Sequence, residues 1–323
     1  MSRELGVVMP YWLDRPDAEA LEIARAAEEA GLDTVWVGEM ASFDAFALAT
    51  AIGVRTERLR LKIGPLAVGV RSPVAIALGV ASVGALTGHP VDVALGASSP
   101  VIVSAWHDRA WGRPAPQTRE MVLALRELLN GRRLEFDGEH VRSHGFRLRG
   151  PQPGVSIAVA AFGPKMTGVA ARHADEVVLN LVTPGHVAEV HRRVREHASA
   201  AGRPVPKLSV WVPVALDPGP AALGQLQGQL AVYLGAPGYG ELFASLGFEA
   251  LVERARAGAA RAELAGAIPE QLVAQIGALG TPDEVARRIA AYHQAGADHV
   301  GIVPSTAEDP AGRRVMAALA RES

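Results

Sequence analysis

The chain has 323 residues, of which 49% are hydrophobic and 20% are charged, so it can bury a sizeable core. Its formal net charge of −2 leaves no broad basic field that would attract nucleic acid or a membrane surface. The absence of cysteine excludes disulfides and thiolate zinc sites. The N-terminal residues lack the apolar stretch of a signal peptide, and no apolar run resembles a transmembrane span. We therefore expect a soluble, cytoplasmic protein.

Helix-compatible segments alternate with apolar, β-rich runs along the chain. Three junctions look alike, because a small residue ends a helix and an Asp precedes a strand; they lie at Glu28–Val37, Ala171–Val178 and Gln294–Val303. This recurring junction is typical of alternating parallel strands and helices. We expect strands near 5–9, 33–38, 59–68, 91–96, 155–161, 176–182, 207–216 and 298–303. We expect helices near 17–30, 43–56, 73–87, 115–130, 164–174, 185–201, 281–296 and 309–321.

Eight such units predict a closed (β/α)8 barrel, a TIM barrel, that forms one domain over residues 1–323. Two segments interrupt the alternation. Residues 132–150 alternate apolar and polar side chains around Asp137-Gly138, which predicts a hairpin insertion after the fourth helix. Residues 218–279 are rich in Ala, Gly and Leu and predict a helical insertion after the seventh strand. Because barrel active sites lie in the loops that follow strands, we expect this second insertion to form part of a lid or pocket wall.

One two-residue turn is the sharpest local signal. An apolar run, Val155–Phe162, stops at Gly163-Pro164, and a helix-compatible run, Lys165–His173, follows at once. Such a turn leaves the first backbone N–H groups of the helix unpaired, while Gly163 lets a ligand approach the backbone closely. This helix N-terminus is suited to a phosphate, with the charge of Lys165 beside it. An ordinary turn between a strand and a helix is the alternative.

The ends of the expected strands carry few ionisable groups. They contain no Ser/His/Asp set, no HExxH, no DxD and no P-loop, and the histidines lack metal-ligand spacing, so we expect no metal site. Glu39, at the end of the second strand, is either a proton carrier or a structural hydrogen-bond acceptor. His107, after the fourth strand, either donates a proton or orients its own loop. The carboxyl ends of the expected strands thus carry few acids and bases and include a possible anion site. This combination indicates a bound organic cofactor.

Four segments occur in the order and spacing of a known family: Asp33–Glu39, Gly64–Val68 with Arg71–Pro73, Ala94–Pro100 and Ala161–Lys165. Together they resemble the bacterial luciferase-like monooxygenase superfamily, in particular its branch of oxidoreductases that depend on the deazaflavin coenzyme F420. The resemblance extends over nearly the whole chain.

The resemblance implies a barrel that binds coenzyme F420, or FMN, at the carboxyl ends of its strands and passes hydride to or from a small substrate. It places a non-prolyl cis peptide bond at Leu66–Ala67 and the phosphate at Gly163–Met166. From their positions at the expected strand ends, we expect Glu39 and His107 to be the catalytic residues. The residues that the resemblance assigns to the cofactor are Met40, Gly64, Leu66, Ala67, Val68, Gly96, Ser98, Ser99, Ala161, Gly163, Pro164, Lys165, Met166 and Asn180. It also implies a homodimer, because dimers are common in the family.

One departure from the family bears on the activity. Relatives often carry a His after the acid of the second strand, whereas this chain has Met40, which cannot exchange a proton. Reduction of the substrate is therefore favoured over its oxidation. An FMN-dependent monooxygenase and a non-catalytic barrel that binds a cofactor or ligand stay open as alternatives. The segment 218–279 offers Tyr233, Tyr239, Phe243 and Phe248, which indicate either an apolar or aromatic substrate or a plain core.

Overall fold

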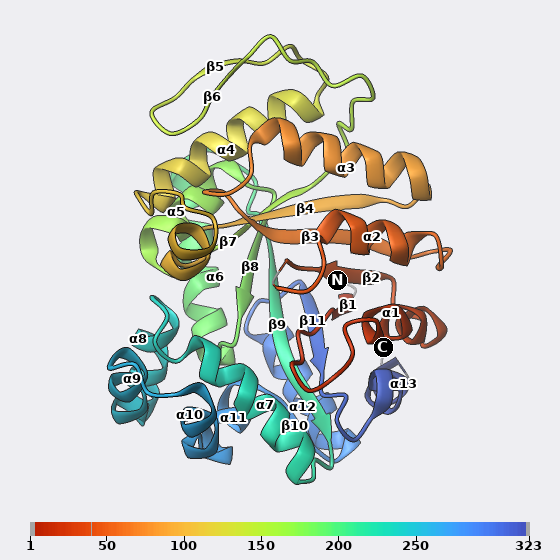
Figure 1. Cartoon of the computed structure of the whole chain (residues 1–323), viewed down its shortest axis with the longest axis vertical. Helices are drawn as coiled ribbons and strands as arrows, with labels where there is room; N and C mark the ends of the chain where they lie inside the picture. Colours follow the sequence, from red (N-terminus) through yellow and green to blue (C-terminus); the bar gives the residue numbers. More distant parts are fainter. Residues whose placement is uncertain (1–3, 40, 321–323) are drawn as a thin grey trace. The chain divides into compact units, whose positions relative to one another are not determined.

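Parallel strands alternate with helices in the computed structural model, which describes residues 4–39 and 41–320 (Figure 1). The strands are β1 (Glu4–Val8), β2 (Thr34–Val37), β3 (Arg60–Ala67), β4 (Val91–Gly96), β5 (Glu135–Asp137), β6 (Arg142–His144), β7 (Ile157–Ala160), β8 (Glu176–Asn180), β9 (Lys207–Leu216), β10 (Ala278–Gly280) and β11 (His299–Pro304). The helices that follow barrel strands are α1 (Glu19–Glu29), α2 (Ala45–Gly53), α3 (Pro73–Thr87), α4 (Pro114–Leu129), α5 (Pro164–His173), α6 (Pro184–Ala200), α12 (Pro282–Gln294) and α13 (Arg313–Ala320).

The strand order defines the fold class. The larger sheet runs β10-β9-β11-β1-β2-β3-β4-β7-β8, and β9 also pairs with β8. Eight parallel strands in this cyclic order, each followed by a helix, form a closed (β/α)8 barrel, which confirms the predicted fold. No helix of the described residues is long and apolar enough to cross a membrane.

The two predicted insertions have the expected secondary structure. β5 and β6 pair as an antiparallel hairpin, in which Phe136 is opposite Ser143. The segment after β9 is helical and contains α7 (Pro220–Tyr233), α8 (Tyr239–Phe243), a π-helical turn η2 (Ala244–Phe248), α9 (Glu249–Arg256), α10 (Arg261–Ala267) and α11 (Glu270–Ile276). The lid role of this segment stays a prediction.

The chain folds as two compact units, and unit 2 holds residues 34–178 and 192–208. In it β2, β3, β4, β7 and the start of β8 pair in parallel. Their side chains are mostly buried, because helices cover one face and side chains from the same strands fill the other. Among those side chains, Lys62 on β3 donates to both oxygens of Glu176 on β8, at 2.8 and 2.6 Å, and its Nζ lies 4.7 Å from the ring centre of Trp36.

β3 contains a bulge whose geometry differs from our expectation. The pairing of β3 with β4 shifts register between Ile63 and Leu66, and the cis peptide bond within this stretch is Gly64–Pro65. The prediction of a cis bond at Leu66–Ala67 is wrong. A cis bond before proline costs about 0.5–1 kcal/mol, against about 3–4 kcal/mol elsewhere, so the proline determines its position.

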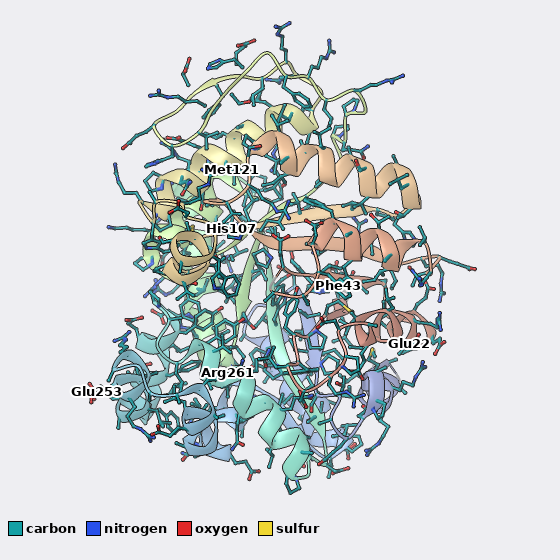
Figure 2. All side chains as sticks on the ribbon, viewed as in Figure 1. Glu22, Phe43, His107, Met121, Glu253 and Arg261 are labelled. Atoms are coloured by element: carbon teal, nitrogen blue, oxygen red, sulfur yellow. The ribbon has the colours of Figure 1, made fainter. Side chains whose placement is uncertain are left out.

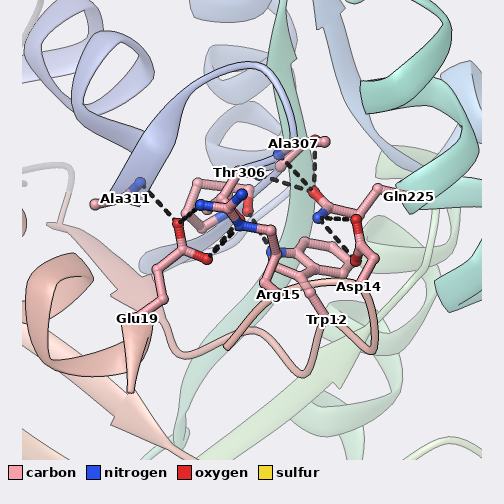
Figure 3. A network of polar contacts seen from close by, with 10 residues as sticks. Trp12, Asp14, Arg15, Glu19, Gln225, Thr306, Ala307 and Ala311 are labelled. Atoms are coloured by element: carbon pink, nitrogen blue, oxygen red, sulfur yellow. Dashed lines mark hydrogen bonds and ion pairs between the residues drawn. The ribbon is translucent and has the colours of Figure 1, made fainter. Parts of the chain in front are cut away.

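Unit 1 holds the remaining described residues, with β1, β9, β10 and β11 in parallel. Figure 3 shows a polar network within this unit that joins the segment after β1, the segment after β11 and α7. Gln225 of α7 is its centre, since its Nε2 donates to Asp14 at 3.1 Å. Its Oε1 accepts from Ser305 Oγ, Thr306 N and Ala307 N at 2.8, 2.8 and 3.2 Å. Trp12 Nε1 donates to the carbonyl oxygen of Pro304 at 3.1 Å, which fixes the indole ring.

Glu19, at the start of α1, belongs to the same network. Its carboxylate accepts from Arg15, from Thr306 Oγ1 at 3.0 Å and from the N–H of Ala311 at 3.2 Å. Burial by itself would raise the pKa of Glu19, but Arg15, Ala311 and Thr306 together lower it below the ordinary value of 4.5. The folded protein therefore favours the ionised form.

We expect Glu19→Gln to lower the free energy of unfolding by about 1–2 kcal/mol at pH 7, because it weakens charge-assisted hydrogen bonds. Since folding lowers the pKa of Glu19, this stabilisation is complete above about pH 4.5 and is lost as the pH falls through the folded pKa. Urea unfolding of both proteins between pH 7 and 3.5 should show the difference narrowing in acid. Glu22→Gln, at an exposed pair with Arg25, is the control and should change stability by less than about 0.5 kcal/mol. A difference that is independent of pH would contradict the assigned role of Glu19.

Candidate functional site

In unit 2, the loops after β2 and β3 meet at an ion-pair cluster. Glu39 follows β2, and Arg71 lies between β3 and α3. Arg71 Nε donates to Glu39 Oε2 at 3.1 Å, and Arg71 Nη2 donates to Glu39 Oε1 and to Asp44 Oδ2, the latter at 2.5 Å. The guanidinium lies over the ring of Phe46, 5.2 Å from its centre. Both oxygens of Glu39 are thus engaged, so a proton-transfer role for Glu39 requires this pair to open.

Asp44 has two roles in this cluster. Its Oδ1 accepts from the N–H groups of Phe46 and Ala47, both at 3.0 Å, and so caps the N-terminus of α2. Burial opposes the ionised form, but the N–H of Ala47 and the guanidinium of Arg71 together lower the pKa of Asp44. The pKa of Arg71 is raised, chiefly by its hydrogen bond to Glu39. The cluster therefore keeps Arg71 and Asp44 charged at neutral pH.

The ends of β3 and β4 approach each other closely. A Cβ on Gly64 would lie 2.2 Å from the carbonyl oxygen of Ala94, so only glycine fits there. A Cβ on Gly96 would lie 3.1 Å from Cβ of Pro65, which shows that the bulge of β3 is packed against the end of β4. Of the other residues assigned to this wall, Leu66 and Val68 are buried and Ala67 is half-buried.

The segment after β4 turns sharply. Ser98 has a positive φ of 66° and is exposed. Ser99 Oγ accepts from the N–H of Ile102 at 3.3 Å at the start of a π-helical turn, η1 (Val101–Trp106). His107 follows this turn and is exposed; Figure 2 labels it. The structure thus places His107 at the surface, in contact with solvent.

The turn after β7 has the geometry of an anion site. α5 begins at Pro164 with Gly163 as its N-cap, and no side chain accepts the first N–H groups of the helix. A Cβ on Gly163 would meet nothing within 4 Å, so the space in front of the helix N-terminus is open. Ala161 is buried, Met166 is half-buried, and Lys165 is exposed beside the opening. The predicted turn, helix start and cation are all present, and ligand binding there stays a prediction.

The assigned residues outside unit 2 need separate description. Asn180 ends β8 and belongs to unit 1, where its Nδ2 donates to Tyr239 Oη at 3.3 Å. Met40 lies outside the described residues. Among the residues that are described, no three His, Asp or Glu side chains gather as metal ligands.

Sequence reasoning missed the role of Arg71 and Asp44. Arg71 is the cation of a loop that follows an apolar strand, and it lies within the Arg71–Pro73 motif. Arg71 follows the third predicted strand, and Glu39 follows the second. Because neighbouring parallel strands bring the loops at their carboxyl ends together, the two opposite charges could have indicated an ion pair.

The fold and these strand ends define a (β/α)8 barrel in which the uncapped N-terminus of a helix lies at the carboxyl end of a strand. The model of the luciferase-like monooxygenase family matches residues 11–299, and the chain belongs to this family. A Mycobacterium tuberculosis protein named as a coenzyme F420-dependent oxidoreductase is 25% identical, with 94% of this chain and 96% of that protein covered.

Two solved structures share the fold over nearly the whole chain. An F420-dependent secondary alcohol dehydrogenase in complex with an F420–acetone adduct has a TM-score of 0.80 at 19% identity, and 99% of each chain is covered. The oxygenating constituent of 3,6-diketocamphane monooxygenase from Pseudomonas putida, in complex with FMN, has a TM-score of 0.72 at 16% identity, with 99% of this chain and 97% of that chain covered.

The Arg71–Glu39 pair can be tested as an energetic unit. We expect a double-mutant cycle of Arg71→Gln and Glu39→Gln to give a coupling free energy of about 1–2 kcal/mol, because both side chains are largely buried and doubly hydrogen-bonded. Urea unfolding at pH 7 measures it. The exposed pair Arg192–Glu196 is the matched control and should couple by less than about 0.5 kcal/mol. Equal coupling in the two cycles would mean that the cluster is an ordinary surface ion pair.

Proposed function

We propose that this protein is an oxidoreductase that transfers hydride between coenzyme F420 and a small organic substrate, with reduction of the substrate favoured. The observation that carries the proposal is the uncapped N-terminus of α5, open in front of Gly163 and flanked by Lys165. A phosphate of the cofactor fits this terminus, since its N–H groups and dipole favour an anion. When bound, a deazaflavin supplies a two-electron hydride carrier that the side chains of this chain cannot provide.

The proposed cofactor wall in unit 2 consists of residues at three strand ends, those of β3, β4 and β7. Gly163, Pro164, Lys165 and Met166 would hold the phosphate. The remaining wall residues, which would orient the ring and its side chain, are Gly64, Leu66, Ala67, Val68, Gly96, Ser98, Ser99 and Ala161. Met40 and Asn180 are also assigned to the cofactor from the family resemblance alone.

Glu39 and His107 are the proposed catalytic residues. Arg71 holds Glu39 by both oxygens, so Glu39 would act as a fixed negative charge until that pair opens. His107 is exposed in the segment after β4 and would be the proton donor. Because Met40 cannot accept the proton that alcohol oxidation releases, these residues favour hydride transfer to an electrophilic substrate. A cytoplasmic location is part of the proposal, since a chain without cysteine has no disulfides that would need an oxidising compartment.

An FMN-dependent monooxygenase is the second candidate. The same helix terminus would accept the phosphate of FMN, and an FMN-bound monooxygenase shares the fold. The third candidate is a barrel that binds the cofactor but does not catalyse a reaction, because Met40 stands where relatives often have a histidine that carries a proton.

Titration of the purified protein with coenzyme F420 and with FMN, followed by tryptophan fluorescence, separates these candidates. We expect binding of coenzyme F420 to be the tighter, and Lys165→Glu to weaken it about tenfold or more, because the variant places a negative charge beside the phosphate. Arg195→Glu makes the same charge change at an exposed site on α6 and should leave binding unchanged. Tight binding of FMN alone would refute the leading proposal. Unchanged affinity in Lys165→Glu would remove Lys165 from the site.

We also propose that the protein forms a homodimer through the outer face of α2 and α3. These two helices lie next to each other in unit 2, and neither contains a charged residue (Figure 1). Leu86, Val54 and Leu78 on or beside them expose 69%, 60% and 47% of their surface, and Phe43 precedes α2 (Figure 2). An uncharged face can pair with its own copy around a two-fold axis without repulsion, and polar residues such as Arg55 would form its rim.

The dimer can be tested by sedimentation velocity. We expect the wild type to sediment at twice the 33.8 kDa chain mass and the variant Leu78→Glu/Leu86→Glu to sediment as a monomer, because each glutamate would be buried unpaired in the interface. Val205→Glu changes an exposed apolar residue elsewhere in unit 2 and is the control. A monomeric wild type would refute the dimer, whereas a dimeric double variant would refute only the proposed face.

A further inference from the structure

Asn180 has a polar atom that no described residue satisfies. Its amide Nδ2 donates to Tyr239 Oη, but its Oδ1 is buried and has no hydrogen-bond partner. Buried amide oxygens are nearly always paired, so an orphan needs an explanation. Asn180 is the last residue of β8, and the carboxyl ends of barrel strands are where ligands bind. The unpaired oxygen is therefore a candidate ligand contact.

Two tyrosines of the helical insertion contact this amide, and a phenylalanine packs against one of them. Tyr233 ends α7 and Tyr239 begins α8, and their ring centres lie 4.8 Å apart. Phe243 is fully buried, with its ring centre 6.3 Å from that of Tyr239. The hydroxyl of Tyr233 also interacts with Asn180. All four residues belong to unit 1, and together we call them the Asn180 cluster.

The Asn180 cluster is tightly packed and uncharged. A Cβ on Gly240 would lie 2.9 Å from the carbonyl oxygen of Leu234, so α8 is packed tightly against the end of α7. Burial raises the pKa of both phenols, so Tyr233 and Tyr239 stay neutral at physiological pH. An ionised group placed here would lose its hydration without gaining a counter-ion, which disfavours charged ligands.

We propose that the Asn180 cluster is the substrate-recognition site, in place of the cofactor role that the resemblance gives Asn180, and that it binds an uncharged aromatic or alicyclic molecule whose hydroxyl or N–H donates to Asn180 Oδ1. The aromatic rings would contact the apolar body of the molecule, and the two phenols would orient the amide. That the cluster binds such a molecule does not depend on the proposed oxidoreductase function. Only the identification of this molecule as the substrate rests on that function.

Three small probes test this inference on the purified chain without cofactor: benzyl alcohol, toluene and benzoate, by ligand-observed NMR titration. Benzyl alcohol should bind about five- to tenfold more tightly than toluene, because only the alcohol can donate to Asn180 Oδ1. Benzoate should bind more weakly than either. Comparable affinities for toluene and benzyl alcohol, or a preference for benzoate, would overturn the proposal.

Variants test whether the preference for benzyl alcohol over toluene depends on Asn180. Asn180→Leu should abolish the preference for benzyl alcohol while leaving toluene affinity within about twofold, because its volume is similar and its polar atoms are lost. Gln229→Met is the matched control, since Gln229 Oε1 on α7 is also buried and unpaired but lies outside the cluster. Tyr239→Phe, which keeps the ring but removes the hydroxyl that orients Asn180, should reduce the same preference and serves if Asn180→Leu does not fold. Equal effects of Gln229→Met and Asn180→Leu would overturn the proposal.

The cofactor experiment distinguishes the two proposals. If coenzyme F420 fails to bind, the probe result still stands, and only the oxidoreductase assignment is lost. If saturating coenzyme F420 displaces benzyl alcohol, Asn180 belongs to the cofactor and the substrate assignment is overturned. We expect both to bind together.

Discussion

The parallel pairing of β2, β3, β4 and β7 is the constraint on which the candidate site depends. Parallel neighbours end at the same edge of a sheet, so residues far apart in sequence meet there without any local signal that they will. Glu39 and Arg71 are 32 positions apart, and Gly96 lies against Pro65 across the bulge. The side chains of each loop can therefore differ while the strands keep the loop in the same position.

Within unit 2 this register is reinforced by one charged contact in the barrel core. Lys62 and Glu176 lie on strands that are not neighbours, and both side chains are almost fully buried. A buried pair of this kind is weak evidence for stability, because desolvation offsets most of its attraction. Its value is specificity, since a shift of β3 by one residue would leave an uncompensated charge in the core.

The fold followed from the sequence more completely than the site did. Buried strands between covered faces give continuous apolar runs, and helices between them begin at signals such as Ser72-Pro73, so most elements are predicted within two or three residues. The helix start at Pro164 was equally local and was predicted correctly. Tertiary features do not follow in this way. The Arg71 cluster depends on contacts between loops, and the resemblance places the cis bond at Leu66–Ala67 although Pro65 immediately precedes Leu66.

Asp44 joins the first turn of α2 to the Arg71–Glu39 pair. One of its oxygens holds the first turn of α2, and the other holds Arg71 and, through it, Glu39. A displacement of α2 is therefore transmitted to the charge beside the second strand, and a change of that charge is transmitted back to the helix. Such coupling is reciprocal by thermodynamic necessity. Any contact on the outside of α2 that shifted its first turn would therefore also change the free energy of the Arg71–Glu39 pair.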